Sequence, residues 1–511
     1  MQVSCLVFLP LLTAFLVIMT PRRFSYLIRW ISVFGTGLHL ALTIMISFLF
    51  WAEAKGDGEL LRTSLVFKLH LVEKISWFDS LGIQYFVGID GISLTMVVLT
   101  SIIIFAGVLA SWNVKERAKE FFALLLILVT GVFGVFVSFD LFLFFMFYEL
   151  AVLPMYLLIG IWGTGPKEYA AMKLTLMLLI GSAFILVGFF ALYYGSGFYT
   201  FDLIKLATAN FPVDFQRWVF PMIFVGFGVI GALYPLHTWS PDGHSSAPTA
   251  VSMLHAGVLM KLGGYGALRI AVFLLPEGAK YWGLFFMGLT TINILYGSFG
   301  AIWQKDLKYF TAYSSVSHCG FVLFGISALN FMGMKGAVIQ MFSHGIMTGL
   351  FFGLIGMVYG RTHTRIISEM GGLARVMPWL ATCFYIGGLA SLGLPGLSGF
   401  IAESHVFLGG FFGHSLQSVG QSGALMKTFT LIATLSIVVT AVYVLRGLGR
   451  VFQGPIENAE FANLEDAMLS EKLSTGILVV VLIVVGLYPS ILIDVIEPAI
   501  RPVLNRLAGG L

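Results

Sequence analysis

Three ionisable residues of the sequence lie in apolar stretches long enough to cross a membrane. Glu149, Lys261 and Glu403 each have mainly apolar neighbours on both sides, and Glu403 follows a break at Pro395 by eight residues. A charged side chain at the centre of a membrane helix costs about 2.5–3.5 kcal/mol on insertion scales, and such residues commonly mark an ion or proton path. Hydrocarbon favours the neutral form of an acid or an amine, which suits groups that take up and release protons. We therefore predict proton transfer at these three residues.

Three histidines form a second set of candidates. His255 precedes Lys261 by six residues, and His318 and His344 lie inside the tenth and eleventh apolar runs. An imidazole titrates at about pH 6.5 in water and can relay protons in either direction. The alternative for all of these side chains is structural, because neighbouring helices can satisfy a buried histidine or carboxylate, and a lysine can extend to the membrane interface.

The composition is that of a membrane protein. Of 511 residues, 58% are hydrophobic and 11% are charged, whereas soluble domains carry about 25% charged residues. Cys5, Cys319 and Cys383 form no CxxC pair, so we expect neither an iron–sulfur cluster nor another metal site. The sequence has no GxGxxG or Walker motif, and its net charge of +4 is scattered. We therefore expect no cofactor and no nucleic acid bound to this chain, and membrane lipid around it.

Apolar runs between polar breaks predict an all-α polytopic membrane protein with about fourteen transmembrane helices. The predicted spans are 3–20, 28–51, 92–112, 121–139, 141–162, 170–194, 218–236, 248–275, 281–303, 309–328, 335–360, 377–413, 426–450 and 473–495. Segment 52–84 is predicted as a long external loop, and the residues after the last span leave no room for another long helix. Lys and Arg concentrate in the loops after odd-numbered spans, which predicts that both termini lie on the non-cytoplasmic side of the cell inner (plasma) membrane.

Two of these spans are interrupted. Pro235 follows the seventh run, and Pro395 lies inside 377–413, which is too long for one straight span. Broken helices persist in membranes where they are buried in protein or line a wet cavity. Two breaks five helices apart, each near ionisable residues, are typical of an inverted repeat in a transporter, although both could be ordinary kinks.

Several motifs, in the same order, give the whole chain a family resemblance. They are VGIDGISL at 87–94, FYEL at 147–150, PLHTWSPDGH at 235–244, APTA at 247–250, KLGGYG at 261–266, DLK at 306–308, YSSVSH at 313–318 and QMFSHG at 340–345. With these motifs the chain resembles the proton-translocating, antiporter-like membrane subunits of respiratory complex I, of the chain M (subunit 4) type. The resemblance implies two inverted five-helix repeats, helices 4–8 and 9–13.

The resulting division of the chain has four parts. They are 1–119 with helices 1–3 and the external loop, 120–275 with the first repeat, 281–450 with the second repeat, and 451–511 with helix 14.

The resemblance also implies site residues and one departure. A proton path would run through the helix-5 glutamate (Glu149), the helix-8 lysine (Lys261) and the helix-12 acid (Glu403). The family's helix-7 lysine, which pairs with the helix-5 glutamate, is replaced here by Ile230. Either His255 and Lys261, with water, take over as its partner, or pumping in this half of the subunit is altered.

The expected function is proton translocation in an NADH–quinone oxidoreductase, driven by redox chemistry in other subunits. NAD, FMN, iron–sulfur clusters and quinone are implied in those partner subunits, and antiporter-like and quinone-site subunits are the expected neighbours. The alternatives are a subunit of a multi-chain cation/proton antiporter or of a membrane-bound hydrogenase, and, in a different class, a membrane scaffold that has lost transport.

Overall fold

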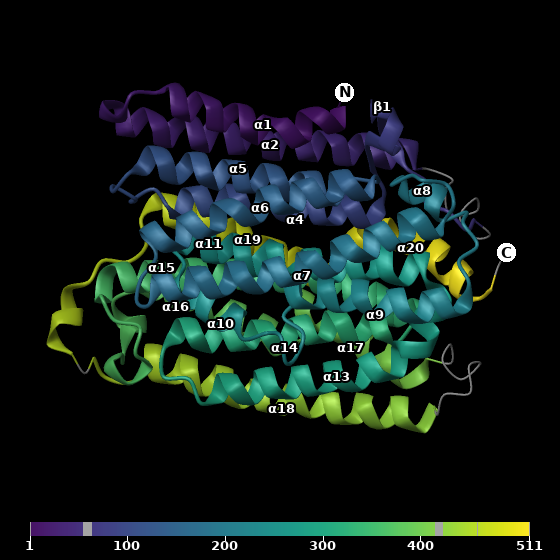
Figure 1. The fold of residues 1–511 in the computed structure, drawn as a ribbon. Helices are drawn as coiled ribbons and strands as arrows, with labels where there is room; N and C mark the ends of the chain where they lie inside the picture. Colours follow the sequence, from purple (N-terminus) through teal and green to yellow (C-terminus); the bar gives the residue numbers. More distant parts are fainter. Residues whose placement is uncertain (1, 55–63, 414–422, 457, 510–511) are drawn as a thin grey trace.

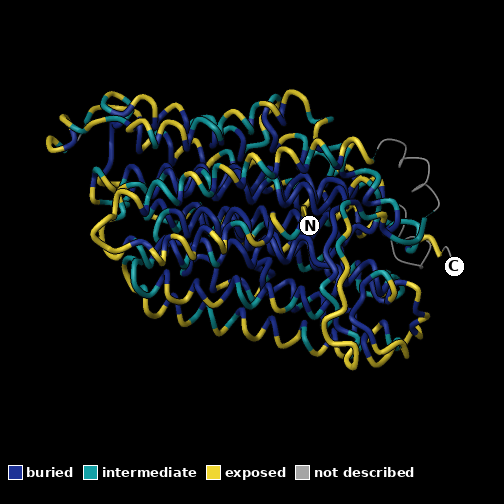
Figure 2. Tube along the Cα trace, turned by 90° about the horizontal axis from the view of Figure 1, so that it is seen from above, coloured by how far each residue is buried: buried dark blue, intermediate teal, exposed yellow. Residues whose placement is uncertain are grey.

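The chain folds into a bundle of long helices that run side by side (Figure 1). The computed structural model describes residues 2–54, 64–413, 423–456 and 458–509. Seen from above, buried residues fill the middle of the bundle and exposed residues lie around its rim (Figure 2). Many exposed side chains are large and apolar, on α2 (Ser25–Glu53), α7 (Lys167–Gly195) and α18 (Gly423–Phe452) among others. An apolar rim around a buried interior is what a membrane bundle requires.

The first half of the chain contains the helices before residue 276. They are α1 (Gln2–Met19), α2 (Ser25–Glu53), α4 (Gly91–Ala110), α5 (Ala118–Val137), α6 (Leu141–Trp162), α7 (Lys167–Gly195), α8 (Leu203–Leu206), α9 (Val213–Ile230), α10 (Trp239–Ser246), α11 (Thr249–Leu254), η3 (His255–Leu259), α12 (Met260–Gly266) and η4 (Ala267–Val272). The second half contains α13 (Pro276–Ile302), α14 (Leu307–Ser327), α15 (Phe331–Thr362), α16 (Pro378–Ser391), α17 (Ser398–Phe412), α18 (Gly423–Phe452), α19 (Leu469–Leu487) and α20 (Ser490–Leu507).

The predicted number of about fourteen spans is confirmed. In the described part of the chain, 11 helices are long and apolar enough to cross a membrane. The other three spans are α14, the composite helix that runs from α11 to η4, and the broken pair α16 and α17. Acidic or amide side chains start several helices by accepting backbone N–H bonds. These capping residues are Asp90 for α4, Asp140 for α6, Asp202 for α8, Asp306 for α14 and Asn330 for α15.

Both predicted helix breaks are present. The seventh span stops at Ile230 and resumes at Trp239, with Pro235 in the connection, and the twelfth stops at Ser391 and resumes at Ser398, around Pro395. The eighth span, predicted as a plain helix, contains two π-helical turns, η3 and η4, on either side of α12. Single π-turns inside α-helices often lie at functional sites because they redirect backbone carbonyls.

A matching backbone contact relates the two five-helix repeats. In the first repeat Asp140, at the start of α6, pairs with Asp202, which follows α7. In the second repeat Asp306, at the start of α14, pairs with Ile366, which follows α15. The two contacts lie five helices apart in the chain, and successive helices alternate in direction, so they lie at opposite ends of the bundle. This is the relation that an inverted repeat demands.

Two predictions about the connections need correction. The described part of segment 52–84, which excludes 55–63, is not only a loop, because β1 (His70–Phe78) pairs with β2 (Ile83–Ile89) as an antiparallel hairpin. The chain after α19 forms a further helix, α20, where no long helix was predicted. Its apolar residues lie on one face, whereas the predicted span 473–495 assumed one continuous apolar run. The tail therefore packs beside the bundle instead of extending the fourteenth span.

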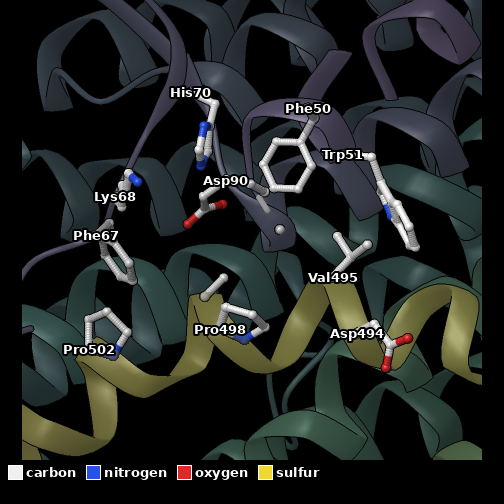
Figure 3. Close-up of a pocket in the computed structure, with 13 residues that line it drawn as sticks. Phe50, Trp51, Phe67, Lys68, His70, Asp90, Asp494, Val495, Pro498 and Pro502 are labelled. Atoms are coloured by element: carbon white, nitrogen blue, oxygen red, sulfur yellow. The ribbon is translucent and has the colours of Figure 1, made fainter. Parts of the chain in front are cut away.

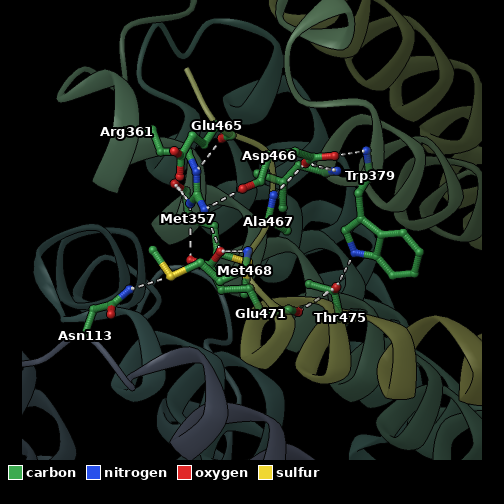
Figure 4. A network of polar contacts seen from close by, with 11 residues as sticks. Asn113, Met357, Arg361, Trp379, Glu465, Asp466, Ala467, Met468, Glu471 and Thr475 are labelled. Carbon is green, nitrogen blue, oxygen red and sulfur yellow. Dashed lines mark hydrogen bonds and ion pairs between the residues drawn. The ribbon is translucent and has the colours of Figure 1, made fainter. Parts of the chain in front are cut away.

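An arginine joins α15, α19 and the segment between α18 and α19 (Figure 4). Arg361 is paired with Glu471 at 2.6 Å and donates to the backbone carbonyls of Glu465 and Asp466. The Asp466 carboxylate accepts from the backbone of Trp379, at the start of α16. These bonds tie the segment between α18 and α19 to α15, α16 and α19, at the end of the bundle opposite β1 and α8.

Candidate functional site: a buried polar row

Lys261 is the centre of the buried polar groups. It is 1% exposed, and its ammonium donates to Nδ1 of His344 at 2.9 Å and to the backbone carbonyl of Ala256. Ala256 belongs to the π-turn η3, where the carbonyl is free to accept a side-chain donor because the normal helical hydrogen bond is displaced. Both partners of Lys261 are neutral groups, and neither is a carboxylate.

A row of side chains continues from His344 into the second repeat. The rings of His344 and His318 stack with 5.0 Å between centroids. Nδ1 of His318 lies 3.6 Å from Oε1 of Glu403, and its Nε2 lies 3.1 Å from the hydroxyl of Ser391. Glu403 lies on α17 directly after the second break, and it is 6% exposed. The row Lys261–His344–His318–Glu403 is thus continuous and shielded from solvent.

His255 belongs to a second cluster beside this row. Its ring stacks on Trp239 at 5.2 Å and lies 4.3 Å from the ring of His244. Neither ring nitrogen of His255 has a hydrogen-bonding partner among the described residues. Every residue of the composite helix from 250 to 274 is buried, so His255 and Lys261 both lie inside the bundle.

The structure adds a polar group that the sequence analysis did not single out. Asp242, in the broken seventh span, pairs with Lys173 at 2.7 Å and accepts from the Tyr309 hydroxyl at 3.1 Å. Lys308 donates to the carbonyl of Ala247 at 2.6 Å, and it lines a cavity of about 620 Å³, with polar and apolar residues in its wall, that opens beside Arg361. The motifs that contain Asp242 and Lys308 were the available signal, because both residues lie in segments that carry the family resemblance.

Glu149 is not part of the row. It is half-buried, it lies beside Ser182 of α7, and its Oε1 has no hydrogen-bonding partner in the described part of the chain. Ile230, at the position of the family's lysine, is buried and apolar. The hydrogen bonds of Lys261 go to His344 and Ala256, so the predicted compensation through Lys261 and His255 is not a direct contact with Glu149.

A second buried cation lies two turns beyond Lys261. Arg269 forms a bidentate pair with Asp90, with N–O distances of 2.5 and 2.6 Å, and the two side chains are 2% and 3% exposed. Asp90 and His70 line a mainly apolar cavity of about 210 Å³ that is closed on one side by Val495 and Pro498 of α20 (Figure 3). Among the described residues, no group of three or more His, Cys, Asp or Glu side chains is placed to hold a metal ion.

Asp140, which lies between two spans, is an acid whose pKa is strongly shifted by its surroundings. Its side chain is fully buried and caps α6 through the backbone N–H groups of Phe142 and Leu143, while Gln84 adds a third donor. Burial raises the pKa of Asp140 to about 6, the three N–H donors oppose that rise, and the nearby Asp202 carboxylate adds to it.

Comparison with known proteins gives the same architecture. Residues 138–426, more than half of the chain, match the family described as NADH:quinone oxidoreductase/Mrp antiporter, TM. The chain belongs to this family. A chain named NAD(P)H-quinone oxidoreductase chain 4 2 from Microcystis aeruginosa is 38% identical over 466 residues, which is 90% of this chain and 81% of that one. As a member of the oxidoreductase and antiporter family, this chain is a multi-pass membrane protein of the antiporter-like type.

Two solved structures share the fold of this family member. A chain of respiratory complex I from Thermus thermophilus with bound NADH superposes with a TM-score of 0.85 at 27% identity, and all of both chains is covered. A chain of the membrane-bound sulfane sulfur reductase, an archaeal respiratory membrane complex, superposes with a TM-score of 0.82 at 22% identity, again over all of both chains. Both structures are multi-subunit membrane complexes.

Proposed function

We propose that this chain is a proton-translocating membrane subunit of an NADH–quinone oxidoreductase of the complex I type. The observation that carries the proposal is the buried row Lys261–His344–His318–Glu403. Lys261 donates to His344 at 2.9 Å, the rings of His344 and His318 stack with 5.0 Å between centroids, and Nδ1 of His318 lies 3.6 Å from Oε1 of Glu403. Buried titratable groups spaced for hydrogen bonding, directly or through a water, are what proton relay requires. Membership of a family that includes NAD(P)H-quinone oxidoreductase chains supports the redox coupling.

The proposed division of labour leaves the redox chemistry to other chains. NADH, FMN, iron–sulfur clusters and quinone would be bound by partner subunits, and this chain would respond to charge changes transmitted along the row. The cavity that reaches Lys308 lies at the bundle end rich in Arg and Lys, which we take as the cytoplasmic end. Protons would then reach Lys261 from that cavity past Lys308 and His244.

The test is proton translocation by the purified complex in lipid vesicles. With NADH and a quinone supplied, we expect Lys261→Met to lower the number of protons moved per electron pair, whereas Lys280→Met should not. Lys280 is the matched control because it pairs with Glu277 in the first turn of α13. Equal proton yields in the two variants would contradict the proposal.

The second candidate is a cation/proton antiporter subunit, because the family includes Mrp antiporters. The same vesicles distinguish the two functions. An antiporter dissipates a proton gradient when sodium is added without NADH or quinone, and we expect no such sodium response here.

A further inference from the structure

His318 presents its two ring nitrogens to different sides. Nδ1 lies 3.6 Å from the Glu403 carboxylate and 3.2 Å from the Gln340 amide, whereas Nε2 lies 3.1 Å from the Ser391 hydroxyl. Ser391 is the last residue of α16, directly before the second helix break, and it is buried. An imidazole can take up a proton on one nitrogen and release one from the other. The row therefore has a polar branch at His318.

The branch continues to Tyr443 on α18. The Tyr443 hydroxyl lies beside Ser391 and is 2.8 Å from the hydroxyl of Ser314. The ring packs edge-on against Phe310, with 5.2 Å between centroids, and the side chain is 2% exposed. A buried phenol needs hydrogen-bonding partners, and serine hydroxyls supply them here. Ser391 and Tyr443 thus form a short chain of hydroxyls that starts at His318.

Tyr443 also lies in the wall of a cavity of about 420 Å³, which we call the α18 cavity. It is formed by α13, α14, α18 and the segment after α15, and α13 and α18 lie side by side at the edge of the bundle (Figure 1). Tyr443, Gly447 and Arg450 share one face of α18, so the cavity extends along this helix to about 14 Å from its last residue. The other polar side chains of its wall are Gln304, Lys305, Ser368 and Arg446.

The mouth of the α18 cavity is basic. Lys305, Arg446 and Arg450 are exposed, and no carboxylate of a described residue forms an ion pair with any of the three. They lie at the bundle end that also carries Lys308, which we take as the cytoplasmic end. Unpaired charges at a membrane surface keep water around them, so the mouth is hydrated. The chain therefore has two cavities at this end, one that reaches Lys308 and one that reaches Tyr443.

We propose that the α18 cavity is a second entrance to the row, in which Tyr443 and Ser391 pass protons from cavity water to His318. The inference rests on the proposed function, because it requires that the row conducts protons. Hydronium gives a proton to the Tyr443 hydroxyl as this hydroxyl gives its own to Ser391, and Ser391 gives one to Nε2 of His318. His318 releases the proton on Nδ1 to the Glu403 carboxylate.

This sequence of transfers balances. The hydronium becomes water and Glu403 gains one proton, while both hydroxyls and the imidazole end with as many protons as before. No group is oxidised or reduced. Glu403 is thereby reloaded without a proton having to cross from Lys261.

The first test removes the Tyr443 hydroxyl in the assembled complex in vesicles. Tyr443→Phe keeps the ring on Phe310 but cannot pass a proton, so we expect fewer protons per electron pair. The loss should not exceed that of Glu403→Gln, because the entrance at Lys308 remains. Tyr385→Phe on α16 is the control, since the buried Tyr385 hydroxyl has no hydrogen-bonding partner among the described residues. Equal yields in the two tyrosine variants would overturn the proposal.

The second test asks whether the two hydroxyls act in series. Ser391→Ala should lower the proton yield as far as Tyr443→Phe does, and the double variant should lower it no further. Ser391→Thr keeps a hydroxyl and should restore the yield, which a purely structural role of Tyr443 would not explain. Losses that add in the double variant, or a yield with Ser391→Thr as low as with Ser391→Ala, contradict the proposal.

The third test measures whether water reaches Tyr443. Tyr443→Cys and Val442→Cys place thiols at the same depth, but Val442 is 48% exposed on the apolar rim. A charged thiol reagent is added from the cytoplasmic side, and modification at each position is read by mass spectrometry. We expect position 443 to react about tenfold faster, because the reactive thiolate forms in water and not in lipid. Equal rates at positions 442 and 443 would show that the cavity is no aqueous entrance.

These readouts separate the second entrance from the proposed function. If Lys261→Met and Glu403→Gln leave the proton yield unchanged, the proposed function fails, and the second entrance fails with it. If both lower the yield while Tyr443→Phe and Ser391→Ala do not, the second entrance fails alone.

Discussion

Lys261 and Arg269 are two buried cations on the same composite helix, and their partners differ in kind. Arg269 has a carboxylate, Asp90, in a bidentate pair, and a guanidinium in that geometry stays charged. Lys261 has an imidazole and a carbonyl, both neutral. An ammonium without an anionic partner in a buried site can release its proton when a neighbouring charge changes. At the scale of residues, Arg269 is therefore a structural cation that keeps its proton, whereas Lys261 is a cation that can release one.

This difference predicts the effect of replacing one cation by another. Lys261→Arg keeps a positive charge but removes a group that can lose its proton, so we expect proton translocation to fall as much as in Lys261→Met. Lys280→Arg, at an ordinary ion pair with Glu277, should have no effect. The measurement is the proton yield per electron pair in vesicles, and near-normal pumping by Lys261→Arg would show that only the charge is needed.

Asp140 gives a prediction of pH dependence. Its pKa is about 6 in the folded chain against 3.8 for a free aspartate, so the folded state binds the proton more tightly. The free energy of unfolding should then decrease as the pH rises from about 4 to about 6, and stay level above that, by at most about 3 kcal/mol. Asp140→Asn retains a capping oxygen and should remove this slope. Thermal unfolding of the purified complex at pH 4.5 and 7 compares the two, and identical slopes would contradict the prediction.

At the scale of elements, the breaks and π-turns position the row. Glu403 reaches His318 because α17 starts afresh after Pro395, and Lys261 finds a carbonyl because η3 leaves Ala256 free. The breaks were predictable because Pro and Gly interrupt an apolar run. The π-turns were not, since a one-residue shift in backbone hydrogen bonding leaves no mark in residue type. The helix α20 was not predicted because only one of its faces is apolar, so it forms no continuous apolar run in the sequence.

Most residues of the site could be predicted from the sequence, but their arrangement in space could not. Lys261, Glu403, His318 and His344 stand out because ionisable groups are costly in apolar runs, and all four meet in the row. Glu149 stands out equally, yet the helix face on which it lies depends on how α6 packs against α5 and α7. Contacts between distant segments set that packing, and apolar periodicity is weak when a helix is apolar on every side.

The Arg361 network gives a prediction for an element. Arg361 and Glu471 are 12% and 6% exposed, so Arg361→Met leaves a buried carboxylate without its partner and should cost about 3–5 kcal/mol. Arg361→Met with Glu471→Met should recover much of that loss, because no charge is then left unpaired. Arg217→Met is the control, since the Arg217–Asp214 pair is exposed and should contribute less than about 1 kcal/mol. Thermal unfolding in detergent measures all three, and equal losses in the single and double variants would contradict the account.

At the scale of the whole molecule, the polar row crosses the boundary between the two inverted repeats. Lys261 comes from the first repeat, whereas His344, His318 and Glu403 come from α15, α14 and α17 of the second. The repeats are related by contacts at opposite ends of the bundle, Asp140 with Asp202 and Asp306 with Ile366. In transporters built from inverted repeats, substrate and coupling-ion sites lie at the interface between the repeats, and the row lies at that interface in this chain.

The measurement that tests this account most directly is the number of protons moved per electron pair by the complex with Glu403→Gln. Glutamine keeps the shape beside His318 but cannot carry a proton, so the account predicts a lower proton yield. Glu497→Gln is the control and should leave the yield unchanged. Glu497 is not part of the row, because its carboxylate pairs with the Lys335 ammonium at 2.8 Å. A normal yield with Glu403→Gln, in a complex that still reduces quinone, would contradict the central claim that the buried row conducts protons.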